Sequence, residues 1–154
     1  MSRPGTATQT PARPRSTGAG RVLVAVYAVL AIAATGRSVF QIIDRFDEAP
    51  IAFSLSAAAA VVYLVATLAL GFRWDRLAWA TIGFELLGVL VIGTLSVVAP
   101  GVLGLDSIDP FGRESTVWSV FGAGYLFVPL ALPVLGLLWL RRGRRGRPAD
   151  GAEG

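Results

Sequence analysis

Glu85 is the side chain with the clearest chemical potential in this sequence, because it lies inside a long apolar stretch. It is eight residues beyond Leu77, where that stretch begins, which corresponds to about 12 Å along an α-helix. In a bilayer this depth is near the middle. An acid there is costly, usually faces protein or water, and is a functional candidate by default. It could bind a proton or a cation, or it could hold neighbouring helices together by a hydrogen bond.

Four more polar side chains in apolar stretches could share a site with Glu85. Arg37 and Gln41 lie four residues apart and therefore on one face of a helix. The backbone of Arg37 is expected about 10 Å farther across the membrane than Glu85, a gap that a long arginine side chain partly closes. Tyr63 is expected at almost the level of Glu85, so we predict Tyr63 as its direct hydrogen-bond partner. Tyr125 is the fourth candidate.

Each of these residues also has a structural interpretation. A pair of Arg37 and Glu85 could fix the register of a small bundle without any further role. For Arg37 we favour this structural role, because its long side chain can also extend toward the membrane interface; for Glu85 both interpretations stay open. Pro129 and Pro133 lie in the last apolar stretch, and we predict that they kink it because each removes a backbone donor.

The composition excludes several classes of site. The chain contains no cysteine and no histidine, which removes disulfides, thiolate metal sites, haem ligation by imidazole and most zinc sites. We therefore predict no metal and no cofactor. A single buried acid without a second acid or base is also a weak basis for general acid–base catalysis, so the sequence leans against an enzyme.

Four apolar stretches must position the candidate residues: residues 22–43, 51–72, 77–98 and 117–140, of 22, 22, 22 and 24 residues. A helix needs about 20 apolar residues to cross a hydrocarbon core of about 30 Å. Helices satisfy their backbone hydrogen bonds within one segment, as a membrane requires. The sequence therefore predicts an all-α fold, an integral membrane four-helix bundle, whose first three spans are antiparallel neighbours because their connections are short.

The arginines indicate how the bundle is oriented. Eleven of the 14 arginines lie before the first span, between the second and third, or after the fourth, whereas the other two connections hold only Arg45 and Arg113. Positive residues accumulate on the cytoplasmic side of membrane proteins. We predict a multi-pass protein of the cell (plasma) membrane with both the N- and C-termini in the cytoplasm.

Two tails flank the predicted membrane domain of residues 21–142. Residues 1–20 and 143–154 are rich in glycine, arginine and other polar or turn-forming residues and are predicted to be disordered. Residues 141–147, which begin with Arg141 and end with Arg147, are expected to bind anionic lipid headgroups at about 1 kcal/mol per arginine; we predict no nucleic-acid partner. Four tryptophans near the span ends are predicted to be interfacial anchors: Trp74, Trp79, Trp118 and Trp139.

Three stretches resemble uncharacterised four-helix integral membrane proteins of actinobacteria. They are ATGRS at residues 34–38, FELLGVLVIGTLS at residues 84–96 and TVWSVFGAGY at residues 116–125. The resemblance covers about residues 20–142, and the arginine-only, alanine-rich composition suits a genome of high GC content. It implies the four-helix membrane fold. It brings no assigned activity, and none of the three stretches carries a catalytic residue across.

Three classes of function fit these observations. The first is a non-catalytic accessory or assembly subunit of a membrane complex, which needs only a compact bundle with exposed packing faces, and this class is favoured. The second is a small transporter that uses Glu85 as a proton or cation site, with Arg37 as a counter-charge, and that would have to form an oligomer, such as a homo-oligomer, to enclose a path. The third is a lipid-binding or lipid-modifying protein with Glu85, Tyr63 and Tyr125 at an apolar cavity.

Overall fold

Three uninterrupted apolar stretches form the three long helices of the bundle. The structure, a computed structural model, describes residues 17–105, 109, 111 and 115–145. Its helices are α1 (Thr17–Arg45), α2 (Pro50–Gly71), α3 (Asp75–Val98) and α4 (Val128–Arg145), with the short 3-10 helices η1 (Phe46–Glu48), η2 (Pro100–Leu103) and η3 (Ser119–Tyr125). The predicted all-α helical bundle is confirmed.

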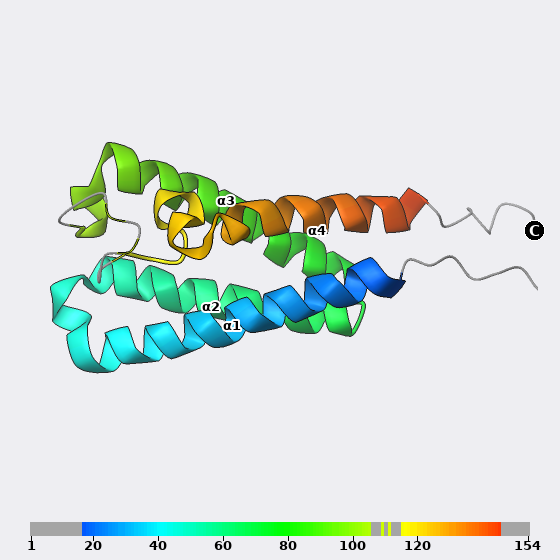
Figure 1. Ribbon diagram of the computed structural model, residues 1–154, viewed down its shortest axis with the longest axis horizontal. Coiled ribbons are helices and arrows are strands. Elements are labelled where there is room, and N and C mark those ends of the chain that lie inside the picture. The colour runs from blue at the N-terminus through cyan, green and yellow to red at the C-terminus, as the bar shows by residue number, and fades with distance from the viewer. Residues whose placement is uncertain (1–16, 106–108, 110, 112–114, 146–154) are drawn as a thin grey trace, which may run out of the picture.

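The helices run antiparallel along one long axis. Figure 1 shows the start of α1, the α2–α3 turn and the end of α4 at one end of the bundle, with η1 and η2 at the other. Helix α2 packs against α1 on one side and α3 on the other. Its buried face repeats a small residue every seven positions, at Ala52, Ala59 and Ala66, all 0% exposed. Small residues at this spacing let the neighbouring backbones approach closely.

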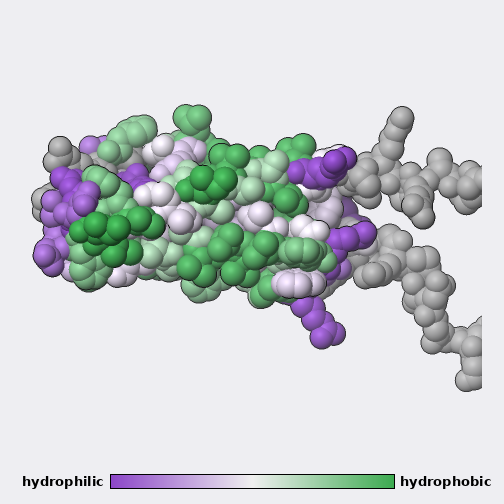
Figure 2. All heavy atoms as spheres, turned by 90° about the horizontal axis from the view of Figure 1, so that it is seen from below, coloured by the Kyte–Doolittle hydropathy of each residue, from purple (hydrophilic) through white to green (hydrophobic). Residues whose placement is uncertain are grey.

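The outer surface is consistent with a helical membrane protein. Among the described residues, three helical segments are long and apolar enough to cross a membrane: Gly18–Glu48, Pro50–Gly71 and Asp75–Val98. A fourth crossing results if η3 and the following helix are counted as one broken span. Figure 2 shows hydrophobic side chains along the middle of the molecule and hydrophilic ones toward both ends. This distribution is what a bilayer with two polar surfaces requires.

The helices extend into both predicted tails. Helix α1 begins at Thr17 and α4 ends at Arg145, so residues 17–20 and 143–145, which were predicted to be disordered, are helical. Packing explains the first extension, since an added Cβ on Gly20 would lie 2.7 Å from the Trp139 ring. That close contact between α1 and α4 holds an extra helical turn that composition alone disfavours. The remaining tail residues lie outside the part of the chain that the structure describes.

The prediction of one helix over residues 117–140 is wrong. Helix α4 begins only at Val128, and it meets η3 at an angle of 98°. Figure 1 shows α4 along the half of the bundle nearest the termini, while η3 fills the other half beside α3. We call residues 115–127 the broken segment. Within it four non-glycine residues have positive φ: Val120, Phe121, Leu126 and Phe127.

The surface of α3 explains why the broken segment is not helical. Gly88 and Gly93 leave gaps into which Trp118 and Phe121 fit; an added Cβ on Gly88 would lie 2.8 Å from the Trp118 ring. The hydroxyl of Ser96 accepts a hydrogen bond of 2.7 Å from the backbone N–H of Val120. These tertiary contacts offset the cost of left-handed backbone, about 1–2 kcal/mol per non-glycine residue.

The bend lies next to Pro129, one of the two prolines predicted to kink this stretch. It precedes Pro129, which occupies the second position of α4, where a missing N–H costs little because it would have no intrahelical partner. The Pro129 ring packs over Gly122, whose φ of +78° is a conformation that glycine adopts readily. Pro133 lies inside α4, which continues through it.

Candidate functional site

Glu85 is buried at the centre of the bundle and bonds to a partner that we did not predict. Its side chain is 0% exposed, and its Oε2 accepts a hydrogen bond of 2.7 Å from the hydroxyl of Tyr27 on α1. Tyr63, the predicted partner, instead accepts a hydrogen bond of 3.2 Å from Nε1 of Trp118. The Tyr27 and Tyr63 rings lie 6.3 Å apart between centroids, so the two hydrogen-bonded pairs are neighbours.

These four side chains form one buried polar cluster: Tyr27, Tyr63, Glu85 and Trp118. Each comes from a different part of the fold, namely α1, α2, α3 and the broken segment, and each is at most 2% exposed. Trp118 was predicted to anchor at the membrane interface, and that prediction is wrong because its indole lies inside the bundle. The cluster ties the broken segment to α2 and ties α1 to α3.

The second carboxyl oxygen of Glu85 gives the cluster its chemical interest. Oε1 is buried and has no hydrogen-bond partner among the described residues. A buried polar atom without a partner costs free energy, and a lone buried charge costs far more. The position therefore suits a carboxyl group that carries a proton or that pairs with a bound cation.

Arg37 lies in a separate polar layer and does not pair with Glu85. Its Nη2 donates to the backbone oxygen of Ser115 at 2.6 Å and to the Ser115 hydroxyl at 2.9 Å. Gln41 is buried one turn farther along α1 at 2% exposure. Arg37 thus holds the start of the broken segment against α1, and the proposed ion pair between Arg37 and Glu85 is not formed.

The broken segment carries its own short hydrogen-bond network beside this layer. The Ser119 hydroxyl accepts from the backbone N–H of Thr116 at 2.9 Å, and the Thr116 hydroxyl accepts from the backbone N–H of Trp118 at 3.1 Å. Residues 115–119 are all buried. Tyr125, the remaining predicted site residue, ends η3 and is partly buried against the hydrophobic core.

The structure therefore brings together Glu85 and Tyr63 of the predicted residues, leaves Arg37 and Gln41 in a separate layer, and places Tyr125 at the end of η3. No protein family, no curated protein and no solved structure was found to match the chain. The resemblance to four-helix actinobacterial membrane proteins stays a prediction. A functional conclusion has to come from the geometry of the cluster and of the broken segment.

An apolar groove does occur in the described part of the chain, but away from the cluster. It lies between α3 and α4, and the residues that line it are Trp79, Leu86, Val134, Leu137, Leu138 and Arg141. None of the four cluster residues reaches it. The hypothesis of a lipid cavity built on Glu85, Tyr63 and Tyr125 therefore gains no support from this groove.

Proposed function

We propose that this protein is a small, non-catalytic subunit of a membrane complex, in which the bundle is a scaffold and the bend of the broken segment is the contact with another transmembrane chain. The observation that carries the proposal is the exposure of this bend. Leu126 is 85% exposed and Phe127 51% exposed, and both have positive φ. The chain thus presents strained, non-helical backbone on its outer surface.

The depth of the bend makes that exposure informative. Arg141 follows the last apolar residues of α4, and Val128 lies 13 residues before it. This separation corresponds to about 20 Å along a helix, which is less than the hydrocarbon thickness of about 30 Å. The bend therefore lies inside the hydrocarbon region and not at a surface.

Lipid is a poor neighbour for such a bend. Non-helical backbone is tolerated at membrane depth where protein buries it or where it lines a water-filled cavity, because lipid chains offer no hydrogen-bond partners. Turn hydrogen bonds satisfy the N–H groups of Leu126, Phe127, Leu130 and Ala131, and Pro129 has no N–H. In the first turn of α4 this leaves the N–H of Val128 to find a partner. A transmembrane segment of a second chain packed on Leu126 and Phe127 would remove the bend from lipid.

The buried polar cluster fits the role of a scaffold. It links α1 to α3 and α2 to the broken segment through two hydrogen bonds at the centre of the bundle. Polar side chains commonly join membrane helices in this way. By fixing Trp118, the cluster fixes the segment that ends in the exposed bend.

One observation favours a second candidate, a proton or cation transporter. The buried Oε1 of Glu85 has no partner among the described residues, and discontinuous helices commonly form the binding sites of transporters. The glutamine variant of Glu85 separates the two candidates, because it retains a hydrogen-bond acceptor for Tyr27 but cannot bind or release a proton.

The proposed orientation places both termini in the cytoplasm and the protein in the cell membrane. Single cysteines at Asp47, Asp109 and Gly143 are unique thiols, because the chain has none of its own. An impermeant thiol reagent applied to intact cells should label the first two positions and not the third, as the arginine distribution requires. Labelling at position 143 together with protection at 47 and 109 would show that the topology is the reverse of the proposed one.

The contact at the bend is tested by crosslinking in native membranes. A cysteine at Leu126, carrying a membrane-permeant photoreactive group, should form a discrete protein adduct because another chain covers it. A cysteine at Ile32 is the matched control, since Ile32 is 74% exposed on the regular helix α1 and should react with lipid alone.

The mass of the adduct identifies the partner. Twice the mass of the chain indicates a second copy, and any other discrete mass indicates a different subunit; both outcomes support the proposal. Lipid adducts alone at both positions, or the same protein adducts at both, would contradict it.

A further inference from the structure

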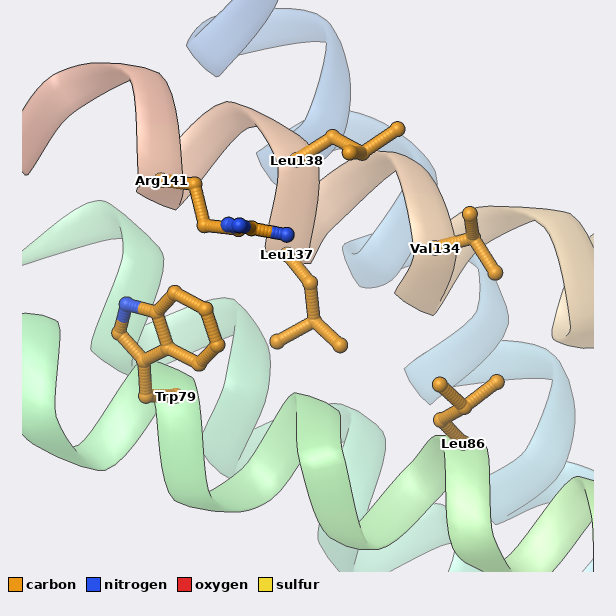
Figure 3. A pocket seen from close by; sticks show the side chains of 6 residues that line it. All are labelled: Trp79, Leu86, Val134, Leu137, Leu138 and Arg141. Atoms are coloured by element: carbon orange, nitrogen blue, oxygen red, sulfur yellow. The ribbon is translucent and has the colours of Figure 1, made fainter. Parts of the chain in front are cut away.

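The groove between α3 and α4 combines an apolar lining with one arginine at its end. It encloses about 420 Å³, within the range of pockets that hold a small ligand. Figure 3 shows Trp79 of α3 and Arg141 of α4 at one end, and Leu86 and Val134 at the other. The groove therefore has a polar end and an apolar end, as a lipid does.

The polar end lies where a bilayer places its headgroups. Arg141 is exposed at the start of the arginine-rich residues that follow the last apolar run. Trp79 is half-buried and lies one turn after Asp75, the first residue of α3, at the depth where tryptophans usually mark the membrane interface. From there the groove runs toward the middle of the membrane along the leucine side chains of both helices.

The charge at this end selects the sign of the ligand. Asp75 is the one described acid at this end. Five described arginines are exposed here, on α1, at the α2–α3 turn and on α4: Arg21, Arg73, Arg76, Arg141 and Arg142. Among these arginines, Arg141 lines the groove. A guanidinium group binds phosphate oxygens through paired N–H donors.

We propose that the groove binds one anionic phospholipid, with an acyl chain between α3 and α4 and the headgroup phosphate on Arg141. This inference does not depend on the contact at the bend, because neither Leu126 nor Phe127 lines the groove. It gives Arg141 a role that its neighbour Arg142 does not share, since the side chain of Arg142 does not line the groove.

Native mass spectrometry of the delipidated protein with added lipid tests this site. Phosphatidylglycerol should remain bound as one molecule under activation that removes phosphatidylcholine with the same acyl chains. Arg141→Gln should lower the occupancy about fivefold, which corresponds to about 1 kcal/mol for one arginine near a headgroup. Arg142→Gln removes the same charge next to the groove and should lower the occupancy less.

A second variant tests the groove without changing the charge. Leu138 is 45% exposed, so Leu138→Trp can fill the groove while the fold is retained, as far-UV circular dichroism would verify. Leu138→Trp should also abolish the retention of phosphatidylglycerol. Three results would overturn the proposal. They are equal losses of phosphatidylglycerol occupancy in the two arginine variants, equal retention of both lipids, and unchanged phosphatidylglycerol binding in Leu138→Trp.

Discussion

Gly93→Ala should destabilise the bundle by about 1–3 kcal/mol, the usual cost of adding a methyl group to a filled interior. An added Cβ at this position would lie 2.6 Å from Cδ1 of Phe121 and 2.9 Å from the Phe121 backbone nitrogen. The ring could rotate away, but the backbone could not move without breaking the contact between α3 and the broken segment. The substitution therefore tests the packing that holds residues 115–127 in their non-helical path.

Gly83→Ala is the matched control on the same helix. An added Cβ there meets nothing within 4 Å, so the higher helix propensity of alanine should leave stability unchanged or raise it by up to about 1 kcal/mol. The midpoint of unfolding in increasing SDS, followed by circular dichroism, measures both variants. If Gly93→Ala is as stable as Gly83→Ala, Phe121 does not pack on α3 in the way described.

The first three spans were predictable because their signal is local. Twenty-two apolar residues in a row can cross a membrane only as a helix, and connections as short as residues 46–49 and 72–74 force antiparallel neighbours. The predicted starts and ends differ from the observed ones mainly at α1, which begins at Thr17. That difference depends on a contact between Gly20 and Trp139, which are far apart in the sequence.

The extent of the break in the fourth span could not be predicted from its own residues. Residues 117–140 are apolar enough to be one helix, and apolar character was the basis of the prediction. The competing contacts are on α3, where Gly88, Gly93 and Ser96 receive the broken segment. The local signal that was available is the pair Gly122 and Gly124 upstream of Pro129, a combination that favours a helix break.

The candidate site was predicted only in part, because its contacts also join residues that are far apart in the sequence. The burial of Glu85, which is 0% exposed, was expected from the cost of a carboxyl group in lipid. Its partner was missed because the predicted start of the first span, at residue 22, was five residues too late. With the observed starts, Tyr27 lies ten residues after Thr17 and Glu85 ten residues after Asp75, so parallel helices bring the two side chains to one level.

Removing either partner of the hydrogen bond between Tyr27 and Glu85 should cost about 1 kcal/mol of unfolding free energy. This value lies between the mean of about 0.6 and the maximum of about 1.7 kcal/mol for membrane hydrogen bonds. Tyr27→Phe leaves the carboxyl group without a described partner, and Glu85→Leu leaves the Tyr27 hydroxyl buried without its acceptor. The double variant removes both polar groups, so it should be no less stable than either single variant. Tyr125→Phe, a partly buried tyrosine outside the cluster, is the control and should change little.

The coupling free energy from this double-mutant cycle should be about 1 kcal/mol, measured by unfolding in SDS. Additive effects of Tyr27→Phe and Glu85→Leu would mean that the hydrogen bond contributes nothing. The cycle therefore measures the structural role of Glu85 alone.

Glu85→Gln distinguishes a structural carboxyl group from a proton site. The amide oxygen can still accept from Tyr27, so stability should change by less than about 0.5 kcal/mol, below the mean cost of about 0.6 kcal/mol for losing a membrane hydrogen bond. If the carboxyl group is only a link between α1 and α3, its infrared C=O stretching band, identified by its loss in Glu85→Gln, should not change with pH while the bundle stays folded. A band that disappears and returns reversibly with pH would show exchange of a proton through a residue that is 0% exposed. That result would favour the transporter over the scaffold, because a sealed structural carboxyl group needs no path for a proton.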